Sequence, residues 1–107
     1  MVTVISLGGS IVAPKDVDVD FLKNFVSVIR SFIEADSNRR FIFVVGGGGP
    51  ARTWQNALRE ISAGGVKDEE ADWIGIMATR LNAQLIKAIM GEWCAQDVVT
   101  NPCEVDP

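Results

Sequence analysis

Two glycine-rich stretches, each following a short apolar segment, constrain the fold of this chain more than any other feature. Residues 2–7 lead into Gly8-Gly9-Ser10, and residues 41–45 lead into four consecutive glycines at positions 46–49. Short apolar runs that end at glycine are typical of buried strands. Glycines can expose successive backbone N–H groups, and a following helix adds unpaired donors, so the pattern suits phosphate binding. A flexible turn is the alternative for either stretch alone, and the repetition favours the phosphate interpretation.

The segments between and after these strands have the periodicity of helices. Residues 21–33 place apolar side chains at intervals of three and four, which predicts an amphipathic helix with Asp18 or Asp20 as its N-cap. Pro50 suits the first turn of a later helix, and Gly91 suits a C-cap. The predicted elements are strands at 2–7, 41–45 and 97–100 and helices at 21–33, 50–61 and 68–90.

The alternation of strands and helices predicts an α/β fold. Strands joined by helices pair in parallel through right-handed crossovers, and the expected result is a three-layer α/β/α sandwich with a mainly parallel sheet. Both glycine loops then leave from the carboxyl ends of their strands, where open α/β sheets bind ligands. Two phosphate-receiving loops side by side indicate passage of a phosphoryl group from donor to acceptor, a reaction catalysed mainly by positioning and charge neutralisation.

The composition limits the remaining function classes. The chain has 107 residues, enough for one domain, and its formal net charge of −4 argues against nucleic acid or an anionic membrane as the main partner. It has no apolar run long enough to span a membrane. With two cysteines and no histidine, it lacks the residues of a zinc site or of a Ser-His or Cys-His hydrolase. A reducing, cytoplasmic compartment is expected.

Several side chains near the glycines are candidates for ligand contacts. Arg52 lies one turn into the helix after the glycines, where its guanidinium could clamp phosphate, although a surface arginine is the alternative. Gly75 lies inside a predicted helix, so something close, backbone or ligand, is expected in the space of its missing side chain, with helix packing alone as the alternative. Thr79, Arg80 and Asn82 are polar on an otherwise apolar helix, which fits either a pocket wall or a hydrogen-bonded face.

A dinucleotide-binding Rossmann domain is an alternative to a phosphotransferase. Gly46-x-Gly48-x-x-Ala51 follows a strand and satisfies the G-x-G-x-x-A fingerprint. That fingerprint also requires an acidic residue at the end of the next strand, whereas the acidic run from Asp68 opens a helix. It also leaves Gly8-Gly9-Ser10 unexplained.

Three motifs in this order resemble the amino-acid kinase family, and within it the archaeal-type uridylate (UMP) kinases. The motifs are Ile5-Ser6-Leu7-Gly8-Gly9-Ser10, Val44-Val45-Gly46-Gly47-Gly48 with Arg52, and Asp72-Trp73-Ile74-Gly75-Ile76 through Thr79-Arg80-x-Asn82-Ala83. The resemblance implies the three-layer fold and transfer of the γ-phosphate of ATP, with Mg²⁺, to UMP, a step of pyrimidine biosynthesis. It implies no side chain that acts as a covalent nucleophile or as a base.

The resemblance also implies roles for individual residues. Arg52 would stabilise the charge of the transferring phosphate, and no metal ligand is identified in this chain. Ser6 stands where many family members have a lysine, which keeps open a non-catalytic relative that binds anions or nucleotides. The ATP phosphates would be bound by Gly8, Gly9, Ser10, Gly48 and Arg52. UMP, or another small phosphate or carboxylate acceptor, would be bound by Gly46, Gly47, Asp72, Gly75 and Thr79.

Members of this family are longer than the present chain. Residues 1–107 therefore resemble the N-terminal, acceptor-side part of the domain, and the C-terminal nucleotide-binding half would be absent. A domain truncated in this way is expected to bind UMP weakly and to have little or no activity alone. Its sheet would keep an unpaired edge, which predicts self-association into a homo-oligomer.

Overall fold

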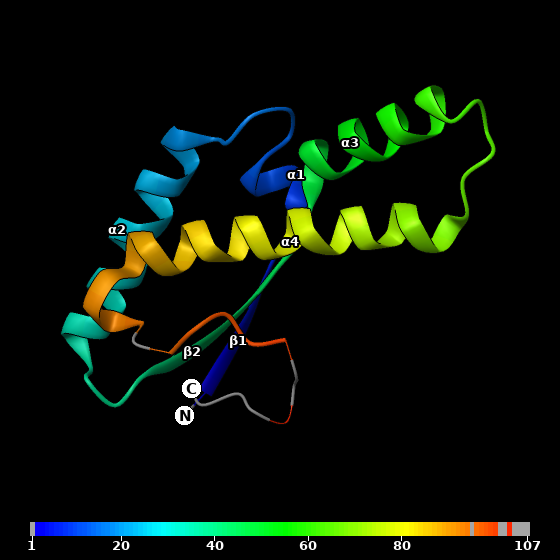
Figure 1. Cartoon of the computed structure of the whole chain (residues 1–107). Coiled ribbons are helices and arrows are strands. Elements are labelled where there is room, and N and C mark those ends of the chain that lie inside the picture. Colours follow the sequence, from blue (N-terminus) through cyan, green and yellow to red (C-terminus); the bar gives the residue numbers. More distant parts are fainter. Residues whose placement is uncertain (1, 95, 101–102, 104–107) are drawn as a thin grey trace.

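The structure, a computed structural model, describes residues 2–94, 96–100 and 103 (Figure 1). The predicted strands at 2–7 and 41–45 and all three predicted helices are confirmed, with ends that differ by a few residues. The elements in order are β1 (Val2–Leu7), α1 (Gly9–Val12), α2 (Val19–Ala35), β2 (Arg40–Val45), α3 (Gly48–Ile61), α4 (Asp68–Met90) and the 3₁₀ turn η1 (Gly91–Trp93). The two short helical turns, α1 and η1, were not predicted. Residues 1, 95, 101–102 and 104–107 of the predicted domain lie outside the described residues.

The sheet pairs β1 with β2 in parallel, so the fold is α/β as predicted. The register runs from Val2 opposite Arg40 to Leu7 opposite Val45. The crossover between the two strands contains α1 and α2. Because the strands are parallel and in register, both glycine loops begin at the same end of the sheet (Figure 1).

The predicted third strand at 97–100 is wrong. These residues form no regular secondary structure, and within the described residues the sheet has two strands. The prediction rested on Val98 and Val99, whose β-branched side chains favour extended backbone, but a strand also needs a neighbour with which to exchange hydrogen bonds. The segment's described contact is a surface ion pair, in which Asp97 Oδ1 lies 3.8 Å from Lys87 Nζ of α4.

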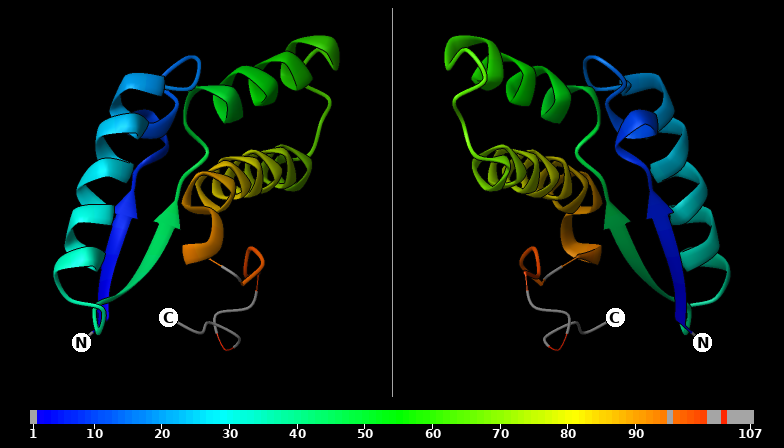
Figure 2. Two further views of the ribbon diagram at one scale, coloured as in Figure 1. Left: turned by 90° about the vertical axis from the view of Figure 1, so that its left-hand side faces the viewer. Right: turned by 90° about the vertical axis from the view of Figure 1, so that its right-hand side faces the viewer.

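The core lies on one face of the sheet. Alternate strand residues such as Leu7 and Val45 are buried, whereas Val2, Val4 and Val44 on the other face are about half exposed. Helices α2 and α4 both pack on the buried face, so the described residues form one helical layer and one sheet layer of the expected three-layer sandwich (Figure 2). The buried core residues are Leu7, Val12, Leu22, Val26, Ile29, Val45, Ile86 and Met90.

Local sequence signals explain where the helices begin and end. Asp18 Oδ1 accepts a hydrogen bond of 3.0 Å from Phe21 N, which confirms Asp18 as the N-cap of α2. Gly91 at the end of α4 has a φ of +60°, and its N–H donates to Lys87 O, which confirms the predicted C-cap. Within the described chain, no helix is both long enough and apolar enough to cross a membrane.

Helices α3 and α4 form an antiparallel hairpin that projects beyond the sheet (Figures 1 and 2). Gln55 Nε2 on α3 donates to Ala71 O on α4 at 2.9 Å, which links the two helices. The C-terminal part of α4 packs in the core through Ile86 and Met90, and its N-terminal part lies beyond it with α3. The hairpin therefore reaches out from the end of the sheet at which the glycine loops lie.

Candidate functional site

The two glycine loops meet backbone to backbone at the carboxyl end of the sheet. The Gly46 N–H donates to Leu7 O at 2.9 Å, which extends the pairing of the strands by one residue. A Cβ atom on Gly9 would lie 2.0 Å from Gly48 N, and one on Gly46 would lie 2.6 Å from Gly9 N. Contacts this short exclude any side chain. The structure thus brings the two stretches that the sequence singled out into direct contact.

The turn at Gly47 and Gly48 has the φ angles of a backbone anion-binding nest. Gly47 is in the αR region, with φ −84° and ψ −32°, and Gly48 has a φ of +65°. This sequence of conformations turns successive N–H groups toward one concave side. The third N–H, of Gly49, donates to Ala13 O at 2.8 Å, and Pro50 has no N–H. The donors that remain for an anion at this turn are the N–H groups of Gly47 and Gly48.

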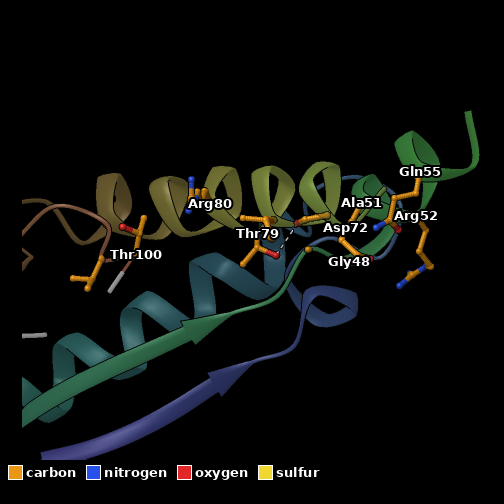
Figure 3. A pocket seen from close by; sticks show the side chains of 12 residues that line it. Gly48, Ala51, Arg52, Gln55, Asp72, Thr79, Arg80 and Thr100 are labelled. Carbon is orange, nitrogen blue, oxygen red and sulfur yellow. Dashed lines mark hydrogen bonds between the residues drawn. The ribbon is translucent and has the colours of Figure 1, made fainter. Parts of the chain in front are cut away.

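A hollow of about 620 Å³ lies beside this turn, with α3 and α4 as its walls (Figure 3). Of the predicted UMP residues, Gly47, Asp72, Gly75 and Thr79 line it. Gly46 does not line it. The complete lining is Gly47, Gly48, Ala51, Arg52, Gln55, Asp72, Gly75, Ile76, Thr79, Arg80, Val99 and Thr100.

The predicted ATP residues are divided between the hollow and the neighbouring loop. Gly48 and Arg52 line the hollow. Gly8, Gly9 and Ser10 do not, since they lie in the other loop, where Gly9 is packed against Gly48 and Ser10 is exposed. The two predicted groups of residues are therefore adjacent, with the Gly47-Gly48 turn at their boundary.

The charged side chains of the hollow suit an anion that carries hydroxyl groups. Arg52 from α3 and Arg80 from α4 supply two guanidinium groups, and Asp72 supplies one carboxylate (Figure 3). Guanidinium groups bind phosphate in a bidentate manner, and a carboxylate accepts hydrogen bonds from hydroxyl groups. Arg52 is exposed to solvent and Arg80 is half-buried.

Gly75 and Thr79 show how the two helices approach each other. A Cβ on Gly75 would lie 2.7 Å from Gln55 Nε2, so the space of its missing side chain is filled by Gln55 from α3. Something close was expected there, and it is a side chain of the neighbouring helix. Thr79 Oγ1 donates to Gly75 O at 3.0 Å, which leaves the lone pairs of the hydroxyl directed to other partners.

Two polar residues hold the elements of this region together: Asn82, for which the sequence left two interpretations open, and Gln55, which the sequence did not single out. Asn82 is 4% exposed, and its Nδ2 donates to Gly46 O at 2.9 Å and to Gly47 O at 3.1 Å. The sequence signal for Asn82 was a polar residue on an otherwise apolar helix. Of the two interpretations, the structure favours a hydrogen-bonded residue over a residue of the pocket wall. Gln55 has polar neighbours in the sequence, so the sequence pattern did not distinguish it from a helix residue exposed to solvent.

The described residues contain no group of three or more His, Cys, Asp or Glu side chains that could hold a metal ion. Cys94 and Cys103 are not joined to each other by a disulfide bond.

Comparison with known proteins relates this geometry to a family. The sequence matches the family described as "Amino acid kinase family" over residues 1–106. It is 42% identical over 102 residues to a uridylate kinase of Methanospirillum hungatei, which covers 94% of this chain and 40% of the relative. It is 38% identical over 104 residues to a uridylate kinase of Methanosarcina barkeri, which covers 97% of this chain and 42% of the relative. A uridylate kinase of Thermoplasma acidophilum is 41% identical over 80 residues, or 75% of this chain and 32% of the relative.

The chain thus spans less than half the length of the curated relatives it matches. The match nevertheless extends over both glycine loops, the α3–α4 hairpin and nearly all of the sequence. It also agrees with the family that the three sequence motifs resemble. The chain belongs to the amino acid kinase family, and it resembles the kinase-like phosphotransferases within it.

Proposed function

We propose that this chain is the N-terminal, acceptor-side part of a uridylate-kinase-like phosphotransferase. The full-length protein transfers the γ-phosphate of ATP to UMP and releases UDP and ADP. The observation that carries the proposal is the contact between the two glycine loops beside a hollow that contains Arg52 and Asp72. The similarity to proteins named uridylate kinase supports UMP as the acceptor.

On the donor side, Gly8, Gly9, Ser10, Gly48 and Arg52 bind the phosphates of ATP. A Cβ on Gly9 would lie 2.0 Å from Gly48 N and 2.7 Å from Gly47 N, so the two loops meet through bare glycine backbone. The N–H groups of Gly47 and Gly48 and the guanidinium group of Arg52 line the hollow, and these donors suit a phosphate. ATP, when bound, supplies the phosphoryl group. The described residues contain no cluster of side chains that could hold Mg²⁺.

On the acceptor side, Gly47 holds the phosphate of UMP, and Asp72 accepts hydrogen bonds from its ribose hydroxyls. Gly46, predicted for the same role, already donates its N–H to Leu7 O and does not line the hollow. Gly75 and Thr79 complete the wall, with Gly75 admitting Gln55 between the helices. A phosphate oxygen of UMP is itself the nucleophile, so the chain needs no nucleophilic side chain. The role of Arg52 is to offset negative charge on the transferring group, which is the main demand of phosphoryl transfer.

Calorimetric titration with UMP tests the acceptor site. The chain is expected to bind UMP weakly, with little or no formation of UDP from ATP. Asp72→Asn should weaken UMP binding about tenfold, because a neutral amide is a poorer acceptor for two hydroxyl groups. Asp68→Asn is the matched control, since Asp68 lies one turn earlier on α4 and does not line the hollow. Absence of UMP binding by the unaltered chain would contradict the proposal.

The remaining expectations concern the full-length protein. It is a cytoplasmic homo-oligomer of pyrimidine biosynthesis, and its additional residues complete the nucleotide-binding half and the second helical layer of the three-layer sandwich. The open face of the sheet, with Val2, Val4 and Val44 exposed, supports a further layer there.

A non-catalytic relative that binds an anion or a nucleotide is the second candidate. Ser6, at the position where many members have lysine, is exposed on the open face of the sheet. Such a protein would bind phosphate but would not form UDP even at full length. A coupled assay of the full-length product with ATP and UMP therefore separates the two candidates. The dinucleotide-binding alternative is not retained, because the acidic run from Asp68 begins α4 and does not follow a strand.

A further inference from the structure

Asn82 connects α4 to the glycine loop. Asn82 is the one buried polar residue among those that the structure describes, with 4% of its surface exposed. Its Nδ2 donates to two successive carbonyl oxygens, Gly46 O at 2.9 Å and Gly47 O at 3.1 Å. Because a buried amide without partners is unfavourable, these two bonds account for an asparagine at an interior position of α4.

The two carbonyls determine the direction of the N–H groups that follow them. In a trans peptide, the C=O of one residue and the N–H of the next point in opposite directions. The described chain contains no cis peptide bond. When Gly46 O and Gly47 O are held against Asn82, the N–H groups of Gly47 and Gly48 are therefore turned to the opposite side of the loop.

These N–H groups are the donors that the nest at this turn still offers. The N–H of Gly49 already donates to Ala13 O at 2.8 Å. Both glycines line the hollow, and the backbone of Gly9 packs so closely on the same turn that a Cβ there would lie 2.0 Å from Gly48 N. The two remaining donors are thus oriented by a residue that is distant in sequence and does not itself line the hollow.

We infer that Asn82 is a positioning residue for phosphate binding, which holds the peptide groups of the loop so that the N–H groups of Gly47 and Gly48 face the phosphate. The inference rests on the proposed function, because UMP and ATP supply that phosphate. Asn82 acts through the loop and does not contact the ligand. Removal of its N–H donors allows the two peptide groups to rotate, and the donors then no longer converge.

Two variants remove the donors in different ways. Asn82→Leu has a similar volume and no polar group, and Asn82→Asp has the same shape but presents carboxylate oxygens to the two carbonyls. Each is expected to raise the Kd for UMP at least about tenfold, as for the loss of hydrogen bonds to a charged group. Ile86→Val is the matched control. Ile86 lies one turn further along α4, is 3% exposed and packs in the core, so this variant should lower stability and leave the Kd within about twofold.

Amide spectra of ¹⁵N-labelled protein separate positioning from general stability. Without ligand, both Asn82 variants should shift the amide resonances of Gly47 and Gly48, whereas Ile86→Val should not. An unchanged Kd for UMP in a folded Asn82 variant would overturn the inference and leave the proposed function intact. If neither variant folds, the inference is tested by adding UMP to the unaltered ¹⁵N-labelled chain. UMP must then shift the resonances of Gly47, Gly48 and the Asn82 side-chain amide, and the absence of these shifts would overturn the inference.

A second probe separates failure of the positioning role from failure of the proposed function. If the unaltered chain does not bind UMP, inorganic pyrophosphate becomes the probe of the same turn. Binding of pyrophosphate that the Asn82 variants lose would support the positioning role without a role for UMP. Equal binding by all variants, or no binding of pyrophosphate at all, would overturn it.

Discussion

At the scale of single residues, a Cβ on Gly49 would lie 2.0 Å from Pro14 O, and one on Gly48 would lie 2.2 Å from Gly9 O. Both obstacles are backbone atoms, which cannot move aside as the end of a flexible side chain can. Gly75 differs, because its neighbour is the amide of Gln55. The glycines of the loops are therefore required by the packing of the protein itself, in addition to any ligand.

Gly9→Ala should lower the free energy of unfolding by about 3 kcal/mol, because the new Cβ would collide with Gly48 N and the loops would have to separate. Urea denaturation followed by circular dichroism measures the change. Gly8→Ala is the matched control, since its nearest contact would be Ile11 Cδ1 at an ordinary 3.8 Å and its φ is −55°. That variant should change stability by less than about 0.5 kcal/mol. Equal effects of the two substitutions would contradict the packing argument.

Arg52→Ala should raise the Kd for inorganic pyrophosphate about tenfold, because a charged donor proposed to bind the ATP phosphates is lost. Its exposed position predicts a change in unfolding free energy below about 0.5 kcal/mol. Calorimetry and urea denaturation measure the two quantities. Arg59→Ala, in the last turn of the same helix and away from the hollow, should leave the Kd unchanged. A similar loss in both variants would indicate a general charge effect.

At the scale of elements, residues with strong local signals were predicted well. The apolar runs before the glycines became β1 and β2, and the periodic segment at 21–33 became the centre of α2, capped by Asp18. Helix α1 was not predicted, because its four residues are held by contacts of the glycine loops and not by periodicity. The strand expected at 97–100 failed for a related reason, since Val98 and Val99 supply local preference but no pairing partner.

Part of the candidate site could also be predicted from the sequence, and part of it could not. The meeting of the two loops could be derived, because parallel strands bring their carboxyl ends to one edge of the sheet. The hydrogen bonds of Asn82 to residues about 35 positions away could not, because spacing along the chain does not determine which side of a helix faces a loop. Gln55 illustrates the same limit, since its partner, Ala71 O, belongs to another helix.

Asp18→Ala should destabilise the chain by about 1 kcal/mol, because the Phe21 N–H at the start of α2 would lose its acceptor. Thermal and urea unfolding measure the effect. Ser31→Ala offers a control in the same helix, where an exposed hydroxyl donates to Ser27 O. That variant should lie within about 0.5 kcal/mol of the unaltered protein. The N-cap assignment fails if Asp18→Ala is as stable as Ser31→Ala.

At the scale of the whole molecule, the described residues cover the sheet on one side only. Val2, Val4 and Val44 are 47%, 62% and 54% exposed, and they lie together on the open face. Exposed apolar surface of this kind, next to strands with unpaired edges, promotes association. The chain alone therefore presents a surface that favours contact with another protein layer.

Val44→Lys should shift the chain toward monomer, because a charge in the middle of the open face is costly to bury. Sedimentation velocity over a range of concentrations measures the distribution. Val28→Lys is the control, since Val28 is similarly exposed, at 51%, but lies on α2. A monomeric unaltered chain at high concentration would contradict the expectation of self-association.

The hairpin of α3 and α4 has a consequence for the motions of the molecule. Helix α3 contributes no residue to the core cluster, whereas α4 reaches that cluster only through its C-terminal half. The hairpin can therefore open in local fluctuations that leave β1, β2 and α2 folded, and its amides should exchange with solvent faster than those of the sheet. A ligand in the hollow between its helices would slow that exchange, because it binds only the closed form.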